Sequence, residues 1–214
     1  MRNLEKDEIE MNARREAMLA EGFRLFSQRG IEGVSMCEVA KACGVGIATL
    51  YRYYNTKFQL VLAISVRQWN NYGEYVRAMR SKRRASEMTA AQELDFYLGF
   101  YIDLYQNHKD ILRFNQDFNN YVRHENATPD QLGVYADVID IFSRMFGELY
   151  EKGKADGTIR TELPEERMFA ATSHIMLAVA VRYAQGLLFQ GDSEVDMTRE
   201  IMLVKRMILR EFVV

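Results

Sequence analysis

The stretch GVGIATLYRYYNTK, Gly44 to Lys57, gathers side chains that can bind phosphate. Thr49 and Tyr51 carry hydroxyl groups, and Arg52 and Lys57 carry positive charges. Hydroxyl groups, basic groups and backbone N–H groups are the donors that contact phosphate oxygens in nucleic-acid complexes. A helix N-terminus adds a partial positive charge to such a site. The stretch therefore indicates a surface that binds a polyanion.

Two short predicted helices, joined by a glycine turn, position these side chains. Ser35 is followed three residues later by Glu38, which is the pattern of a capping box, and this predicts a helix over residues 36–42. Gly44 ends that helix and can adopt a left-handed turn at low cost. The next helix is expected from about residue 46 to 54. The arrangement is that of a helix-turn-helix, although an ordinary helical hairpin has the same spacing.

The charge of the chain is divided unevenly between its two parts. The formal net charge is −2, but residues 11–84 carry 13 Lys and Arg against 5 Asp and Glu, a balance of +8. Residues 85–214 carry 13 against 21, a balance of −8. A basic module on an acidic body favours an N-terminal unit that faces something anionic. Chance clustering, helped by the basic run at 80–84, is the alternative.

The composition predicts an all-α fold of about nine helices. The 214 residues include two prolines, Pro129 and Pro164, and no stretch alternates long enough between apolar and polar residues to form a convincing strand. Residues 81–88 and the sequence HENATP are expected to be loops. The expected helices cover residues 12–28, 36–42, 46–54, 57–80, 89–107, 109–123, 129–154, 164–189 and 195–212.

Several classes of protein are excluded by the same sequence. The N-terminus is charged and is no secretory signal, and the longest apolar run, 175–181, is far short of the roughly 20 residues of a membrane span. Two cysteines are too few for a disulfide framework, so we expect a cytoplasmic protein. The three histidines, at 108, 124 and 174, lack metal-ligand spacing. Without a nucleophile–base motif or a phosphate loop, we expect neither an enzyme nor a cofactor.

The segment from about Met18 to Leu60 resembles the DNA-binding domain of the TetR family of bacterial transcriptional regulators. The matching pieces are MLAEGFRLF, RGIEGVS, VAKACGV and TLYRYYNTKFQL. Farther along, GKADGTIR before a proline-started helix is also similar to that family. The resemblance implies a helix-turn-helix DNA-binding domain over residues 1–60 and a helical effector-binding and dimerisation domain over residues 61–214.

The function that the resemblance implies is ligand-responsive regulation of transcription. The protein would be a homodimeric repressor, bound to a palindromic double-stranded DNA operator and released by a small, aromatic or apolar effector. The last two helices, 165–189 and 195–212, would form the dimer interface. A helical protein-interaction module, or an activator without a small-molecule inducer, remains the alternative.

The resemblance also implies which residues contact DNA. Thr49, Tyr51 and Lys57 match positions that hold phosphates. The full predicted set is Met36, Cys37, Gly46, Ile47, Ala48, Thr49, Tyr51, Arg52, Tyr53 and Lys57.

Within that set, Ile47, Ala48 and Arg52 fall where base contacts vary between relatives. Tyr53 is left open between core packing and a backbone contact. Tyr54, outside the set, matches an aromatic residue that packs into the core of the small domain.

Aromatic residues recur at helical spacing in the acidic part of the chain. Such stripes form either plain core or the wall of an effector pocket, and the sequence leaves both readings open. The predicted effector-binding residues are Tyr97, Tyr101, Phe114, Phe118, Tyr121 and His174.

Overall fold

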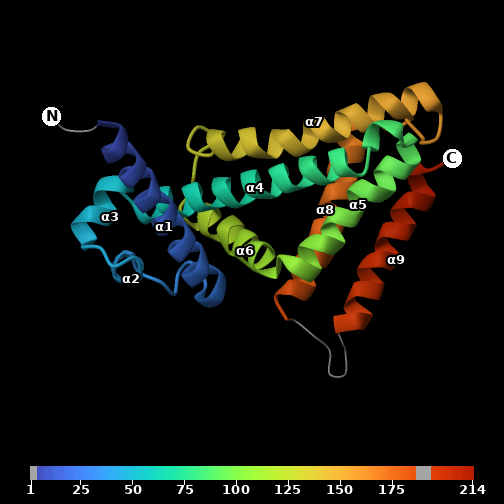
Figure 1. Ribbon diagram of the computed structural model, residues 1–214. Coiled ribbons are helices and arrows are strands. Elements are labelled where there is room, and N and C mark those ends of the chain that lie inside the picture. Colours follow the sequence, from blue (N-terminus) through green and yellow to red (C-terminus); the bar gives the residue numbers. More distant parts are fainter. Residues whose placement is uncertain (1–3, 187–193) are drawn as a thin grey trace. The chain divides into compact units, whose positions relative to one another are not determined.

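The computed structural model confirms the all-α fold in the part of the chain that it describes, residues 4–186 and 194–214 (Figure 1). One short 3-10 helix, η1 (Ala85–Glu87), lies in the segment expected to be a loop. The nine α-helices of the described residues are α1 (Leu4–Arg29), α2 (Met36–Ala42), α3 (Ile47–Tyr53), α4 (Lys57–Lys82), α5 (Ala90–Asn107), α6 (Lys109–His124), α7 (Gly133–Asp156), α8 (Glu165–Ala184) and α9 (Glu194–Phe212).

The first helix is longer than predicted. Helix α1 begins at Leu4 rather than near residue 12. The added turns carry Glu and Lys, which are good helix formers but give no apolar stripe, so a search for periodicity misses them. The ion pair between Arg14 and Glu10, spaced i and i+4, links this added part to the predicted helix.

The prediction that Pro129 starts a helix is wrong. Pro129 lies in a turn, where the Leu132 N–H reaches the carbonyl groups of Thr128 and Pro129, and α7 begins at Gly133. Thr128 and Gln131 bond reciprocally, each side chain accepting from the other's backbone N–H, and this holds the turn. The predicted end of the next helix, 185–189, falls partly outside the described residues.

The chain divides into two compact units, which do not coincide with the predicted boundary at residue 60. Unit 1 comprises Met1–Trp69 and Phe114–Tyr135, and unit 2 comprises Asn70–Arg113 and Ala136–Val214. Where the functional domains begin and end stays a prediction.

The core of unit 1 joins the short helices to two longer ones. Met18 and Phe26 from α1, Leu50 from α3 and Ile64 from α4 are all buried in it. Phe114 of α6 packs there too, edge-on against Phe23 at a ring-centroid distance of 5.5 Å. From Phe114 onward, α6 therefore completes the core beneath the helix-turn-helix.

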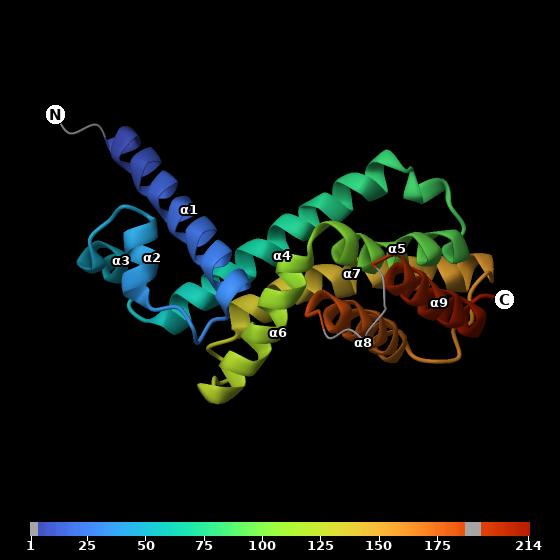
Figure 2. The ribbon, with the colours of Figure 1, turned by 90° about the horizontal axis from the view of Figure 1, so that it is seen from below.

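In unit 2, helices α5, α8 and α9 pack against one another (Figure 2). Tyr105 of α5 is buried, and its hydroxyl contacts the Met197 sulfur of α9 at 3.2 Å. Beyond α9, Val213 pairs with Ile159 in an isolated antiparallel bridge. This bridge attaches the end of the chain to the connection between α7 and α8.

Candidate nucleic-acid interface

The capping box predicted at the start of α2 is present. The Ser35 hydroxyl accepts from the Glu38 N–H at 3.3 Å, and a Glu38 carboxylate oxygen accepts from the Ser35 N–H at 2.8 Å. Arg29 donates to the other Glu38 oxygen at 2.7 Å. Together these donors lower the pKa of Glu38 to about 2, with the Ser35 N–H contributing most. The first turn of α2 is thus fixed by its own side chains.

A Schellman motif ends α2 and forms the turn into α3. Gly44 adopts a positive φ of 67° and donates its N–H to the carbonyl of Lys41 at 3.1 Å. The Val45 N–H reaches back to the carbonyl of Ala40 at 3.0 Å. These are the two bonds of the motif, and its left-handed position favours glycine.

Helix α3 has one buried side and one exposed side. Leu50 is fully buried against the rest of unit 1. Ile47, Ala48, Tyr51 and Arg52 are exposed, and their spacing of i, i+1, i+4 and i+5 places them on one face.

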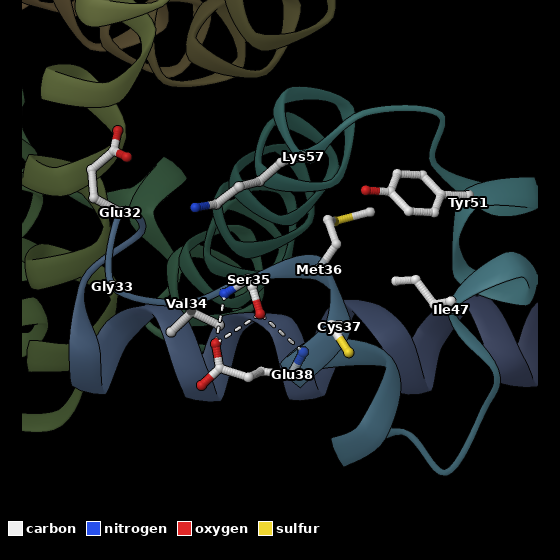
Figure 3. A pocket seen from close by; sticks show the side chains of 10 residues that line it. All are labelled: Glu32, Gly33, Val34, Ser35, Met36, Cys37, Glu38, Ile47, Tyr51 and Lys57. Atoms are coloured by element: carbon white, nitrogen blue, oxygen red, sulfur yellow. Dashed lines mark hydrogen bonds between the residues drawn. The ribbon is translucent and has the colours of Figure 1, made fainter.

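Beside this face lies an open hollow of about 600 Å³ (Figure 3). The Tyr51 side chain extends into it from α3, and Lys57 enters it from the start of α4. The Lys57 ammonium lies 5.9 Å from the Phe26 ring centroid and 5.8 Å from that of Tyr121. Among the described residues it has no carboxylate partner, and a cation at a helix N-terminus opposes the helix dipole. Its position favours an anionic ligand.

The predicted contact residues are exposed to different degrees. Cys37 and Gly46 are exposed, Thr49 and Tyr53 are half-buried, and Met36 is buried, although it borders the hollow. That Met36, Cys37, Gly46 and Thr49 contact DNA stays a prediction. For Tyr53, core packing and a DNA-backbone contact both stay open.

Tyr54 packs inward as predicted. Its side chain is buried in the core of unit 1, and burial raises the pKa of its hydroxyl to about 12. The hydroxyl oxygen has no hydrogen-bond partner in the described part of the chain.

The structure divides the predicted effector residues between the two units. Phe114, Phe118 and Tyr121 are buried in the core of unit 1, where the plain core reading accounts for them. Tyr97 and Tyr101 belong to unit 2, and their rings meet edge to face at 6.1 Å. An effector role for these residues stays a prediction.

His174 is exposed on α8, whereas its neighbour Ser173 faces inward. The Ser173 hydroxyl is buried without a hydrogen-bond partner among the described residues, and it lies close enough to the hydroxyls of Tyr97 and Tyr101 to influence their ionisation. Burial raises the pKa of Tyr97 well above its ordinary value. Sequence reasoning missed Ser173 because a serine inside a helix carries no distinctive signal, and one residue along a helix turns a side chain by about 100°.

Residues 4–186 and 194–214 contain neither a metal-binding cluster nor a membrane-spanning helix. No three His, Cys, Asp or Glu side chains are grouped so as to hold a metal ion. None of the helices there combines the length and the apolar character needed to cross a membrane.

Residues 18–64, which form the helix-turn-helix and its supporting helices, match the profile of the family described as bacterial regulatory proteins, tetR family. The chain is also 25% identical over 180 residues to the HTH-type transcriptional regulator SAB2452 of Staphylococcus aureus (strain bovine RF122 / ET3-1). That alignment covers 84% of this chain and 87% of the relative.

The chain belongs to the TetR family. It is therefore a DNA-binding transcriptional regulator, and its family is not one of enzymes. Helices α2 and α3 are the helix-turn-helix of a TetR family member, and the hollow at Lys57 borders the face that such a module presents.

Solved structures share the fold of this TetR family regulator along nearly its whole length. A transcriptional regulator from Saccharomonospora viridis in complex with choline superposes with a TM-score of 0.71 at 18% identity, covering 94% of this chain and 97% of that one. FadR from Bacillus subtilis in complex with stearoyl-CoA gives 0.70 at 12% identity, covering 91% and 97%. At these identities the likeness shows the fold.

Proposed function

We propose that this TetR family regulator is a cytoplasmic homodimeric repressor whose two α3 helices enter successive major grooves of a palindromic operator. The observation that carries the proposal is the exposed face of α3 beside Lys57. Ile47 and Tyr51 on that face are 39% and 45% exposed, so both are open to a partner. Half-sites about 34–36 Å apart would suit the two reading helices.

Within this interface, Thr49, Tyr51 and Lys57 hold the DNA backbone. Thr49 lies in the first turn of α3, and Tyr51 and Lys57 line the hollow, where a phosphate would meet the unpaired ammonium. The exposed residue Gly46 and the thiol of the exposed Cys37 border the same DNA backbone.

Base edges are read by Ile47, Ala48 and Arg52. All three are exposed on α3, and Arg52 can pair with a guanine through two hydrogen bonds. Met36 supports this surface from below, and Tyr53, which is half-buried, adds a backbone contact.

Dimerisation uses α8 and α9, which pack together in unit 2. Ile175 on α8 and Met202, Leu203 and Met207 on α9 are exposed, Met207 by 58%. Apolar side chains concentrated in this way on two adjoining helices support an interface with a second copy.

The effector binds in unit 2 next to Tyr97, Tyr101 and Ser173. An interior hydroxyl without a partner beside two tyrosines supports a ligand that brings its own polar group. The solved relatives bound to choline and stearoyl-CoA support ligand binding by this fold, and their ligands differ too much in chemistry to name this one.

Selection of bound sequences from a random DNA pool tests the proposal. The expected product is a palindrome that occurs in the source genome, and its affinity should fall steeply in a log–log plot against salt concentration. A pool that yields no enriched sequence at low salt would overturn the proposed operator binding. Transcription from the selected site should rise when the gene for this protein is deleted; a fall would assign an activator.

A further inference from the structure

Unit 1 contains a group of buried polar side chains that DNA binding does not use. They lie on α4 and α6: Ser65 is 0% exposed, Gln68 is 8% exposed and Asn115 is 3% exposed. The Ser65 hydroxyl and the Gln68 nitrogen have no hydrogen-bond partner within the described residues. Buried polar groups are nearly always paired, because an unpaired one loses its bonds to water without replacement. Two such groups three residues apart on one helix point to something that binds there.

Asn115 shows what kind of partner is missing. Its side-chain oxygen accepts from the Trp69 indole N–H at 3.3 Å and from the Tyr135 hydroxyl at 3.4 Å. The indole can only donate, so it fixes which amide atom is the oxygen. The Asn115 NH₂ group is thereby left as a donor on the side of the amide away from these two bonds.

The arrangement of α4 brings these groups to one side of the helix. Ser65, Gln68 and Trp69 follow the i, i+3, i+4 spacing, so the unpaired donors share a face with the indole that binds Asn115. The surroundings are aromatic, since the Tyr135 ring lies 4.9 Å from that of Phe118. Burial raises the pKa of Tyr135 to about 12, so its hydroxyl remains a donor at neutral pH.

From this we infer that unit 1 has an internal binding site for a small uncharged molecule that offers a carbonyl or similar acceptor oxygen to Gln68 and Asn115. An apolar body would pack against Trp69 and Tyr135. The acceptor end carries no charge, because the five side chains are themselves uncharged and the adjacent Arg67 is already paired with Glu16 at 2.7 Å. Ketones, esters and amides have this chemistry, whereas an ammonium group has no acceptor oxygen to offer.

A regulatory role for this site rests on the proposed function, but binding at the site does not. Trp69 is the only tryptophan in the chain, so its indole N–H gives a single resonance that reports on this site alone. The full-length ¹⁵N-labelled protein, without DNA, is titrated with cyclohexanone, cyclohexylammonium and cyclohexanecarboxylate. We expect cyclohexanone to shift the indole resonance saturably, and the two ions to shift it less at equal concentration.

Substitutions separate the site from a plain packing defect. Gln68→Met keeps the size of the side chain but removes its donors, and it should weaken cyclohexanone binding about fivefold, the effect of one neutral hydrogen bond. Ser65→Ala is a second variant with the same expected direction. Both should leave the free protein as stable as wild type or more so, because each removes an unpaired buried group. Gln28→Met, on the exposed side of α1, is the matched control and should bind as wild type does.

The inference is overturned if cyclohexanone shifts the indole resonance no more than cyclohexylammonium does, which would leave internal water as the partner of these donors. It is also overturned if Gln68→Met binds cyclohexanone as tightly as Gln28→Met. If cyclohexanone shifts the indole resonance but leaves the affinity for the operator unchanged, only a regulatory role for the site is contradicted. Failure of the DNA selection would instead contradict only the proposed operator binding.

Discussion

The Val45 N–H donates to the carbonyl of Ala40 at 3.0 Å, and this bond closes the turn between the two short helices. It can form only because Gly44, between them, has a φ of 67°. Apart from Gly44 itself and its two chain neighbours, no atom lies within 4 Å of the place where a Gly44 Cβ would be, so conformation rather than space requires glycine.

Gly44→Ala should therefore destabilise the protein by about 1–2 kcal/mol, the cost of a left-handed alanine. Urea unfolding followed by circular dichroism measures the loss, and hydrogen exchange at the Val45 amide should quicken. Gly44→Asn is the control, because asparagine tolerates this conformation and should lose less. Equal losses in the two variants would contradict a conformational cause.

Removing the Lys57 ammonium should weaken binding to every DNA sequence alike. Lys57→Ala should lower the slope of log affinity against log salt by about one, since one phosphate contact is lost. Tyr51→Phe should also weaken all sequences, without a change in the salt slope. Fluorescence anisotropy with the selected operator and a scrambled duplex measures both effects. A Lys57→Ala slope equal to that of wild type would remove Lys57 from the phosphate contacts.

Arg52→Ala should change which sequence is preferred. If Arg52 reads a base, discrimination at one operator position should fall by about 1–3 kcal/mol while the other positions keep theirs. Repeating the selection from the random pool with this variant measures the change. If the variant selects the same DNA sequence as wild type, Arg52 does not read a base and would instead contact the DNA backbone.

The DNA-binding module was largely predictable because its signals are local. The spacing of Ser35 and Glu38 fixes the start of α2, and the conformational demand at Gly44 fixes its end, so neither depends on distant parts of the chain. The packing of α6 was not predictable in this way. Phe114 and Phe118 form an aromatic stripe that suits any core, and only the tertiary structure shows that they lie beneath the helix-turn-helix.

The interior polar groups were harder still to find. Ser65, Gln68 and Ser173 belong to no motif in the sequence. Only the structure shows that their polar atoms are buried without hydrogen-bond partners among the described residues. His174 was predicted to bind the effector because an imidazole can form polar contacts, but its position around α8 leaves it exposed. Helix phase is set by contacts across the fold, which a single sequence does not give.

The capping box at α2 should make stability depend on acid pH through Glu38. Its folded pKa of about 2 lies below the ordinary 4.5, so its contribution is fully present above pH 4.5 and is lost as the pH falls towards 2. Glu38→Gln keeps an acceptor for the Ser35 N–H but has no charge to lose. The difference in melting temperature between wild type and Glu38→Gln should thus be constant above pH 5 and shrink below it. A difference that does not change with pH would contradict the assigned pKa.

The two cysteine thiols should react at different rates. Cys37 is exposed beside the hollow, whereas Cys43 is half-buried, and burial raises the pKa of its thiol. At pH 7.5 one thiol should react quickly with Ellman's reagent and one slowly, and Cys37→Ser should abolish the fast phase. Because Cys37 borders the proposed DNA backbone contact, the selected operator should protect it. Fast labelling that is unaffected by saturating operator would place Cys37 outside the interface.

A buried ion cluster in unit 2 should contribute strongly to its stability. Glu93 is 3% exposed and accepts from Arg80 of α4 at 2.6 Å and from Lys152 of α7, while Arg80 also pairs with Glu148. Removing one member of a buried cluster leaves its partners without compensation, so Glu93→Gln should cost about 3 kcal/mol. Arg80 and Lys152 are partly exposed, and Arg80 would still pair with Glu148. The expected loss of stability is therefore at the lower end of the range for buried ion pairs.

Asp95→Asn is the matched control for Glu93→Gln. Asp95 lies on the same helix and pairs with Lys205 at 3.0 Å, but its side chain is 56% exposed. Exposed pairs contribute about 1 kcal/mol or less, because water screens them. Urea unfolding of both variants at neutral pH and 0.15 M salt compares them. If Asp95→Asn lost as much stability as Glu93→Gln, burial would not be what gives the Glu93 cluster its strength.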